Sequence, residues 1–198
     1  MLTKSEKTTK FIIETVAPIF NQKGYAATSM AAITKATNLT KGAIYGNFKN
    51  KEEIAIAAFN KTVNDLLVRI AAHQKQSKSP LQKIYLITDF YRNYYDFSKE
   101  LGGCPILNVG VDANNQDTSL LEQVRFVINK TQNNIAKILD WGKEVGEIKT
   151  TVNSQLFAKK IYAHIQGAIF MTYTMDDDSY LKNAMDEMDD IIKNQLEN

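Results

Sequence analysis

The sequence contains few residues that break helices or cross-link chains. Its 198 residues include one Cys, three Pro and nine Gly. Because Cys104 stands alone, the chain can form neither an internal disulfide nor a zinc site built from cysteines. The scarcity of Pro and Gly favours long helices, and a 44% hydrophobic content suffices to bury a full core. We therefore expect an all-α protein of about nine helices.

Catalytic and metal-binding patterns are also scarce. His73 and His164 are the only histidines, and the chain has neither a His-Glu-x-x-His pattern nor a glycine-rich phosphate loop. The consecutive carboxylates of Asp176, Asp177 and Asp178 are expected to cap a helix rather than hold a metal ion. We expect a protein that is not an enzyme and has no cofactor and no metal site.

Long apolar runs are missing as well. The N-terminal residues MLTKSEKTTK lead into an amphipathic pattern rather than a secretory signal. The stretch from Ile161 to Met175 is interrupted by His164 and Gln166, and it is shorter than the roughly 18 to 20 apolar residues of a membrane span. These features predict a cytoplasmic protein without a membrane partner.

Charge is unevenly distributed along the chain. Residues 1–50 hold seven lysines against Glu6 and Glu14, a balance of +5, whereas the remaining residues balance to −3. All three arginines (Arg69, Arg92 and Arg125) lie outside the first 50 residues. The asymmetry indicates an anion-binding module at the N-terminus, although an ordinary solvated lysine face would look the same by charge alone.

Two short helical patterns joined by a turn lie between Thr28 and Lys51. Thr28 or Ser29 can cap the first helix, and Asn38 can end it because Asn tolerates the left-handed conformation. Thr40 can cap a second helix, Lys41 to Phe48, which turns Ile44 and Phe48 inward. This spacing is typical of a DNA-binding helix-turn-helix.

The second helix combines a flat backbone patch with hydrogen-bond donors. Gly42 and Ala43 allow close approach to a partner, and the side chains around them offer hydroxyl, amide and ammonium donors for phosphates and base edges. The residues predicted to bind DNA are Thr28, Ser29, Thr40, Lys41, Gly42, Ala43, Tyr45, Asn47, Lys49 and Lys51.

This segment resembles the N-terminal domain of the tetracycline-repressor-like (TetR) family. The family motif stands here as Thr28, Ile33, Ala36, Leu39, Thr40, Gly42, Tyr45, Phe48, Lys51 and Glu52. Three positions depart from it: Thr34 replaces an alanine, Asn38 the turn glycine and Asn47 a frequent histidine. The resemblance implies a dimeric, ligand-responsive transcription regulator.

The rest of the chain is expected to be helical. A first helix from Ser5 to Lys23, closed by Gly24, completes a three-helix DNA-binding domain at residues 1–50, and a helix at 51–75 links it to a larger ligand-binding and dimerisation domain at 76–198. We expect one aromatic-rich helix from Leu81 to Ser98 and an irregular stretch at 102–117. Three further helices are expected at 118–145, 153–174 and 178–196.

The last two helices have generous apolar faces. In the TetR family the corresponding pair forms a four-helix dimer interface, which here implies contacts by Leu156, Ala168, Met171, Leu181, Met185, Met188 and Ile192. The alternative is that these faces complete the core of the single chain.

The resemblance also implies a small-molecule pocket in the larger domain. Candidate lining residues are Phe90, Tyr91, Tyr94, Cys104, Asn108, Phe126, Tyr162 and Phe170, although aromatic residues at helical spacing are also typical of plain core.

The sequence therefore predicts a homodimeric repressor that a small-molecule effector releases from a near-palindromic DNA operator. The alternative is a helical ligand- or protein-binding module whose N-terminal domain no longer reads DNA. Binding to a near-palindrome that weakens steeply with salt distinguishes the first from the second.

Overall fold

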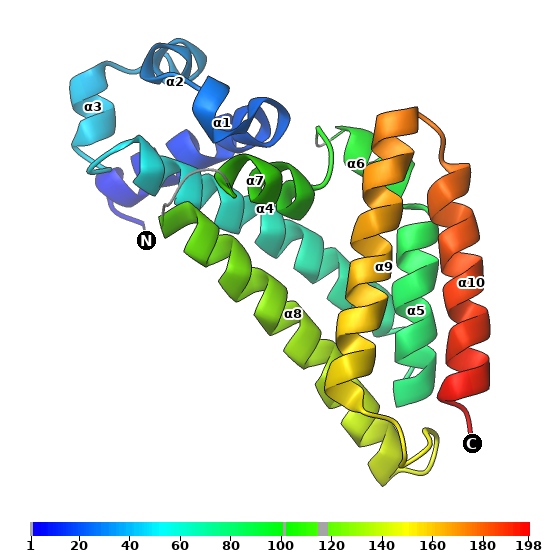
Figure 1. Cartoon of the computed structure of the whole chain (residues 1–198). Helices are drawn as coiled ribbons and strands as arrows, with labels where there is room; N and C mark the ends of the chain where they lie inside the picture. Colours follow the sequence, from blue (N-terminus) through cyan, green and yellow to red (C-terminus); the bar gives the residue numbers. More distant parts are fainter. Residues whose placement is uncertain (1, 101, 115–118) are drawn as a thin grey trace. The chain divides into compact units, whose positions relative to one another are not determined.

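The computed structural model describes residues 2–100, 102–114 and 119–198. Within these ranges the chain is all-α, as predicted, and forms ten helices (Figure 1). They are α1 (Lys4–Ala27), α2 (Met30–Thr37), α3 (Lys41–Tyr45), α4 (Lys51–Gln74), α5 (Pro80–Arg92), α6 (Tyr94–Glu100), α7 (Pro105–Ala113), α8 (Ser119–Glu144), α9 (Ser154–Met175) and α10 (Ser179–Gln195). Among these residues no helix is sufficiently long and apolar to cross a lipid bilayer.

The chain divides into two compact units, each built from two segments. The N-terminal unit comprises Met1–Leu66 and Leu101–Arg125, and the C-terminal unit comprises Leu67–Glu100 and Phe126–Asn198. The second segment belongs to the N-terminal unit because α7 packs on α1. The side-chain amide of Asn21 donates to the carbonyl of Gly103 (3.0 Å), and that of Asn108 donates to the carbonyl of Asn21 (2.9 Å).

The core of the N-terminal unit comes from the apolar faces of α1 to α4. Its buried side chains include Ile12, Val16, Phe20, Ile33, Ile44, Phe48, Ile54 and Phe59, among which Ile44 and Phe48 were predicted to face inward. Gly24 interrupts α1 with a positive φ of 77°, at the position predicted to close the first helix. The side chain of Asn50 caps α4 by accepting from the backbone N–H of Glu53 (2.8 Å).

Two predictions for the middle of the chain are wrong. The expected helix from Leu81 to Ser98 is two helices, because Asn93 leaves the helical conformation (φ −106°, ψ 11°) and separates α5 from α6. The stretch expected to be irregular contains α7, which begins at Pro105 and buries Ile106 and Val109. Residues 115–117 and the predicted start of the next helix at residue 118 lie outside the described residues.

The core of the C-terminal unit is centred on α10, which packs against α5 and α9. Four of the residues implied for a dimer interface (Leu181, Met185, Met188 and Ile192) are at most 1% exposed in the single chain. They are therefore core residues, because the apolar face of α10 is covered by its own chain. At the start of α10, Asp178 occupies the N-cap position without a side-chain capping hydrogen bond, and the carboxylate of Asp177 accepts from the backbone N–H of Ser179 (2.9 Å).

Candidate nucleic-acid interface

The predicted helix-turn-helix is formed by α2 and α3. The hydroxyl of Ser29 caps α2 by accepting from the N–H of Ala32 (3.1 Å), and the hydroxyl of Thr40 caps α3 by accepting from that of Ala43 (3.2 Å). Between the helices Asn38 is left-handed (φ 55°, ψ 27°), a conformation that Asn tolerates better than most residues. The helix α3 is shorter than predicted and ends at Tyr45, but the turn that follows still buries Phe48.

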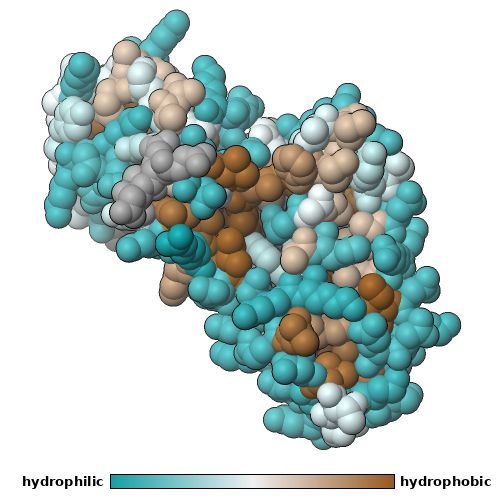
Figure 2. All heavy atoms as spheres, viewed as in Figure 1, coloured by the Kyte–Doolittle hydropathy of each residue, from teal (hydrophilic) through white to brown (hydrophobic). Residues whose placement is uncertain are grey.

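The outer side of α3 presents polar groups around a flat backbone patch. Thr40, Lys41, Gly42 and Ala43 are exposed, and Tyr45 is 46% exposed. Ile44 is fully buried and anchors the helix from its inner side. The surface over α2 and α3 is mostly hydrophilic or intermediate (Figure 2). This face can donate hydrogen bonds to phosphates and bring the backbone close to a groove.

Three residues predicted to bind DNA have their side chains engaged inside the unit. Thr28 is fully buried, and its hydroxyl donates to the carbonyl of Gly24 (2.7 Å). The ammonium of Lys51 donates to the carbonyl of Tyr25 (2.9 Å) and lies 4.1 Å from the centre of that ring. Thr28 and Lys51 therefore hold the motif in place rather than extend from it.

Asn47 is the third of these residues. Its side-chain oxygen accepts from the hydroxyls of Ser5 (2.9 Å) and Thr9 (3.1 Å), and its amide donates to the carbonyl of Ala43 (2.9 Å). Ser5 and Thr9 were not predicted as part of the site. They lie 42 and 38 residues from Asn47, so no local sequence pattern indicates the contact. They fasten the first turns of α1 to the end of α3.

Charge on this side of the unit comes from lysine. Lys41 and Lys49 are exposed, and residues 1–66 contain no arginine, so the bidentate contact between arginine and guanine has no donor here. Glu53 accepts from the backbone N–H of Lys49 (2.5 Å), which fixes the chain as it enters α4. Burial and the charge of Glu52 raise the pKa of Tyr25 above its ordinary value.

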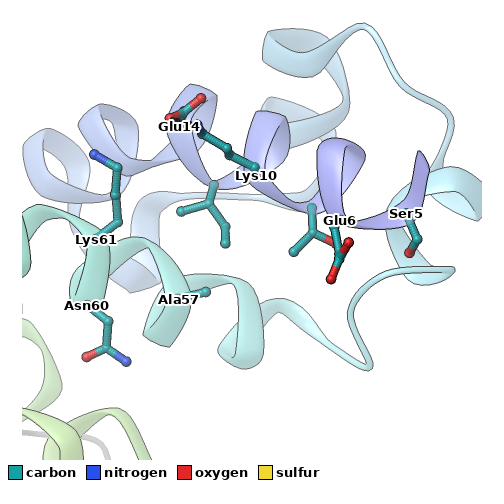
Figure 3. Close-up of a pocket in the computed structure, with 9 residues that line it drawn as sticks. Ser5, Glu6, Lys10, Glu14, Ala57, Asn60 and Lys61 are labelled. Carbon is teal, nitrogen blue, oxygen red and sulfur yellow. Dashed lines mark ion pairs between the residues drawn. The ribbon is translucent and has the colours of Figure 1, made fainter. Parts of the chain in front are cut away.

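A groove of about 540 Å³ lies between α1 and α4 of the same unit (Figure 3). It is lined by Ser5, Glu6, Thr9, Lys10, Ile13, Glu14, Ala57, Asn60 and Lys61. Its lysines have carboxylate neighbours, since Lys10 lies 3.8 Å from Glu14 and Lys61 pairs with Asp65. These pairs leave the rim with little net attraction for a charged ligand.

The residues predicted to line an effector pocket fall into different environments. Phe90, Tyr91 and Tyr94 form an aromatic cluster in the C-terminal unit, with ring centres 5.1 to 6.1 Å apart. Tyr162 is also buried in that unit, whereas Phe126 and Phe170 are 58% and 50% exposed.

Cys104 and Asn108 belong instead to the N-terminal unit. Cys104 is 1% exposed at the start of α7, and the amide of Asn108 donates to the carbonyls of Asn21 (2.9 Å) and Gly102 (3.0 Å). Asn108 thus braces α7 against α1.

Comparisons with known proteins agree with this architecture. The family model described as bacterial regulatory proteins, tetR family, matches residues 12–58, and that described as tetracyclin repressor-like, C-terminal domain, matches residues 80–188. A solved TetR-family regulator from Cytophaga hutchinsonii has a TM-score of 0.92 and 32% identity, covering 99% of this chain and 98% of that one. A solved TetR regulator from Chloroflexus aurantiacus has a TM-score of 0.92 and 30% identity, covering 99% of each chain.

A functionally described relative is similar along most of its length. The fatty acid metabolism regulator protein of Bacillus subtilis is 24% identical over 170 residues, which cover 85% of this chain and 84% of that protein. Together with the capped helix-turn-helix and its exposed donors, these matches show that the chain belongs to the TetR family of DNA-binding bacterial transcriptional regulators.

Proposed function

We propose that the protein is a homodimeric repressor that binds a near-palindromic operator and leaves it when a small molecule binds. The observation that carries this proposal is the exposed donor face of α3, held by its own caps on a buried Ile44. A relative from Mycobacterium, described as the transcriptional repressor DhaR, is 24% identical over 162 residues and supports repression rather than activation.

Recognition is divided between base edges and phosphates. Lys41, exposed in the first turn of α3, is the donor for a base edge, and Ala43 can meet a thymine methyl group. Thr40, Tyr45 and Lys49 flank it and suit phosphate oxygens. Ser29, exposed at the start of α2, is a further hydroxyl donor toward the backbone.

One short helix makes too few contacts for a specific complex, so the site requires a second copy. The exposed face of α9 suits this role. Leu156, Ala163, Gly167 and Phe170 recur at helical spacing and are all exposed, Leu156 by 66% and Phe170 by 50%. A Cβ at Gly167 would meet nothing within 4 Å, which leaves room for a close helix crossing.

The proposed dimer face on α9 includes only some of the residues that the sequence predicts for the interface. Leu156 is exposed and Met171 is half-buried, whereas Ala168 is 8% exposed and the four apolar α10 residues lie in the core. A hollow of about 330 Å³ beside Leu156, also lined by Phe157 and Lys160, could receive a side chain of the second copy. Two recognition helices about 34 to 36 Å apart would read successive turns of DNA.

The effector is proposed to bind the C-terminal unit near the cluster of Phe90, Tyr91 and Tyr94. A structural neighbour, the regulator FadR of Bacillus subtilis, is solved with stearoyl-CoA; it has a TM-score of 0.73 and 21% identity, a likeness of fold. A long-chain acyl-CoA is therefore a reasonable first ligand to test. By linkage, an effector that weakens DNA binding must itself bind less tightly to the DNA complex, by the same factor.

The deciding experiment is selection of bound duplexes from a random library, followed by titration of the enriched sequence at several salt concentrations. A near-palindrome bound with a steep salt dependence supports the proposal and supplies an assay for effector release. No enrichment by folded, dimeric protein would favour the alternative, a ligand- or protein-binding module with a silent DNA-binding domain.

A further inference from the structure

A break in α1 leaves backbone groups that another part of the chain satisfies. Gly24 has φ 77° and ψ 174°, so the regular hydrogen bonding of α1 is interrupted there, and Tyr25 to Ala27 form a final turn beyond it. Only glycine takes this conformation at little cost. The peptide N–H groups that follow such a break need an acceptor from outside the helix.

The acceptor is the carboxylate of Asp112, on α7. One of its oxygens accepts from the N–H of Tyr25 (2.5 Å) and from that of Ala26 (3.2 Å). A Cβ at position 24 would lie 3.1 Å from the Cγ of Asp112, so the carboxylate fits against a residue without a side chain. These residues are separated by more than 80 positions in sequence, yet both belong to the N-terminal unit.

The same peptide unit is held from a second side. The ammonium of Lys51, the first residue of α4, donates to the carbonyl of Tyr25 (2.9 Å) and lies over its ring. Tyr25 precedes the cap of α2 by four residues, and Lys51 follows α3. The two side chains therefore fasten the chain where it enters the helix-turn-helix and where it leaves.

We propose that Asp112 is a positioning residue for DNA binding, acting with Lys51 to fix Tyr25 and hence the orientation of α2 and α3. Asp112 makes no contact with DNA in this scheme. It restricts the conformations of the link between α1 and α2 before DNA is bound. Operator binding then does not have to order this link itself. The inference rests on the proposed DNA-binding function and adds a residue from α7 to it.

The hydrogen bonds between Asp112 and the backbone of α1 involve a charged acceptor. A carboxylate that accepts from backbone N–H groups makes charge-assisted bonds, which are roughly twice as strong as neutral ones. Removing it exposes two backbone donors to water and loosens the link. Since each 1.4 kcal/mol is a factor of ten in affinity, we expect Asp112→Ala to weaken operator binding about tenfold.

The test compares Asp112→Ala, Asp112→Asn and the control Val111→Ala in the full chain. Val111 precedes Asp112 on α7 and is 60% exposed. Two quantities are measured: the hydrogen exchange rates of the Tyr25 and Ala26 amides by NMR, and the Kd for the selected duplex and for a random duplex. A positioning role predicts faster exchange and weaker selected-duplex binding in Asp112→Ala, with random-duplex binding unchanged, because the exposed lysines remain. Val111→Ala should match the wild type.

Asp112→Asn keeps an oxygen at the same place without the charge, so its affinity for the selected duplex should fall about threefold. This variant replaces Asp112→Ala in the test if the alanine variant fails to fold. Equal Kd values for the selected duplex in the wild type and the folded Asp112 variants would overturn the proposal. Unchanged exchange at Tyr25 and Ala26 would also overturn it, whatever the DNA affinity. A wild type that enriches no sequence would instead refute the proposed function, while the exchange rates still decide whether Asp112 holds Tyr25.

Discussion

Lysines in the N-terminal unit serve two purposes that their sequence positions do not distinguish. Lys41 and Lys49 are exposed to solvent, whereas the ammonium of Lys51 donates a hydrogen bond to the carbonyl of Tyr25. All three stand in or beside the same motif. Exposure separates those that can reach DNA directly from the one that supports the motif.

We predict that Lys41→Ala and Lys49→Ala weaken DNA binding in different ways. Loss of a base-edge donor costs about 1–3 kcal/mol on the selected duplex and relaxes its sequence preference. Loss of a phosphate contact weakens binding to all duplexes alike and reduces the salt slope by about 1. Titration of both variants on selected and random duplexes at several salt concentrations checks this. Equal losses on the two duplexes for both variants would remove the assignment of Lys41 to a base edge.

A second prediction concerns pH and a hydrogen bond between α8 and α9. The hydroxyl of Ser154 donates to Asp140 (2.5 Å), and this bond, with help from Lys143, holds the pKa of Asp140 below its ordinary value of 3.8. A carboxylate whose pKa is lower in the folded state than in the unfolded state stabilises the protein at pH values above the unfolded-state pKa. This contribution is lost as the pH falls through the folded-state pKa.

The wild type should therefore exceed Asp140→Asn in free energy of unfolding by a constant amount at neutral pH, and the difference should shrink as the pH drops below about 4. Chemical denaturation at one protein concentration and a series of pH values measures it. A difference that stays constant down to pH 2 would show that Asp140 contributes no such linkage.

Side-chain interactions could be predicted where the hydrogen-bond partners lie close together in sequence. The caps Ser29 and Thr40 and the left-handed Asn38 follow from residues within three positions, so the sequence alone predicts them correctly. The engagement of Asn47 by Ser5 could not be predicted, because the partner lies 42 residues away.

At the scale of elements, helices with capping residues were predicted with bounds close to those observed, as with α9, which was predicted at 153–174 and begins at Ser154 after the cap Asn153. The helix α7 was missed because its nine residues follow two glycines and have no side-chain cap: Cys104 makes no capping hydrogen bond. Its stability comes from burial of Ile106 and Val109, a tertiary effect.

The end of α8 offers an element-scale prediction. A Cβ at Gly142 would lie 2.4 Å from the Cδ1 of Ile148, which is fully buried. Gly142→Ala should therefore lower the free energy of unfolding by about 1–3 kcal/mol, despite the better helix propensity of alanine. Thermal or urea unfolding measures this.

Gly110→Ala is the matched control for this substitution. Its Cβ would make an ordinary contact, 3.5 Å from a methyl of Val124, so no loss of stability is expected. Equal stability of the Gly142→Ala variant and the wild type would mean that Ile148 moves aside without cost.

At the scale of the whole molecule, the proposed dimer depends on the exposed face of α9. Replacing both Leu156 and Phe170 with glutamate places charges where the proposed partner helix packs. We expect this variant to sediment as a monomer and to lose at least a hundredfold in affinity for the selected duplex, since the two half-sites are then bound independently. Val68→Glu, at an exposed apolar position on α4, should remain dimeric. A dimeric double variant would place the interface elsewhere.

The two-segment composition of the N-terminal unit bears on the order in which the protein folds. Residues 1–66 leave the ribosome well before Asp112, yet the final turn of α1 gains its acceptor only from that side chain. Contacts so far apart in sequence are slow to form, because closing a long loop costs entropy before any contact compensates it. We therefore expect the link between α1 and α2 to become fully ordered only after α7, made several seconds later during synthesis, has joined the unit.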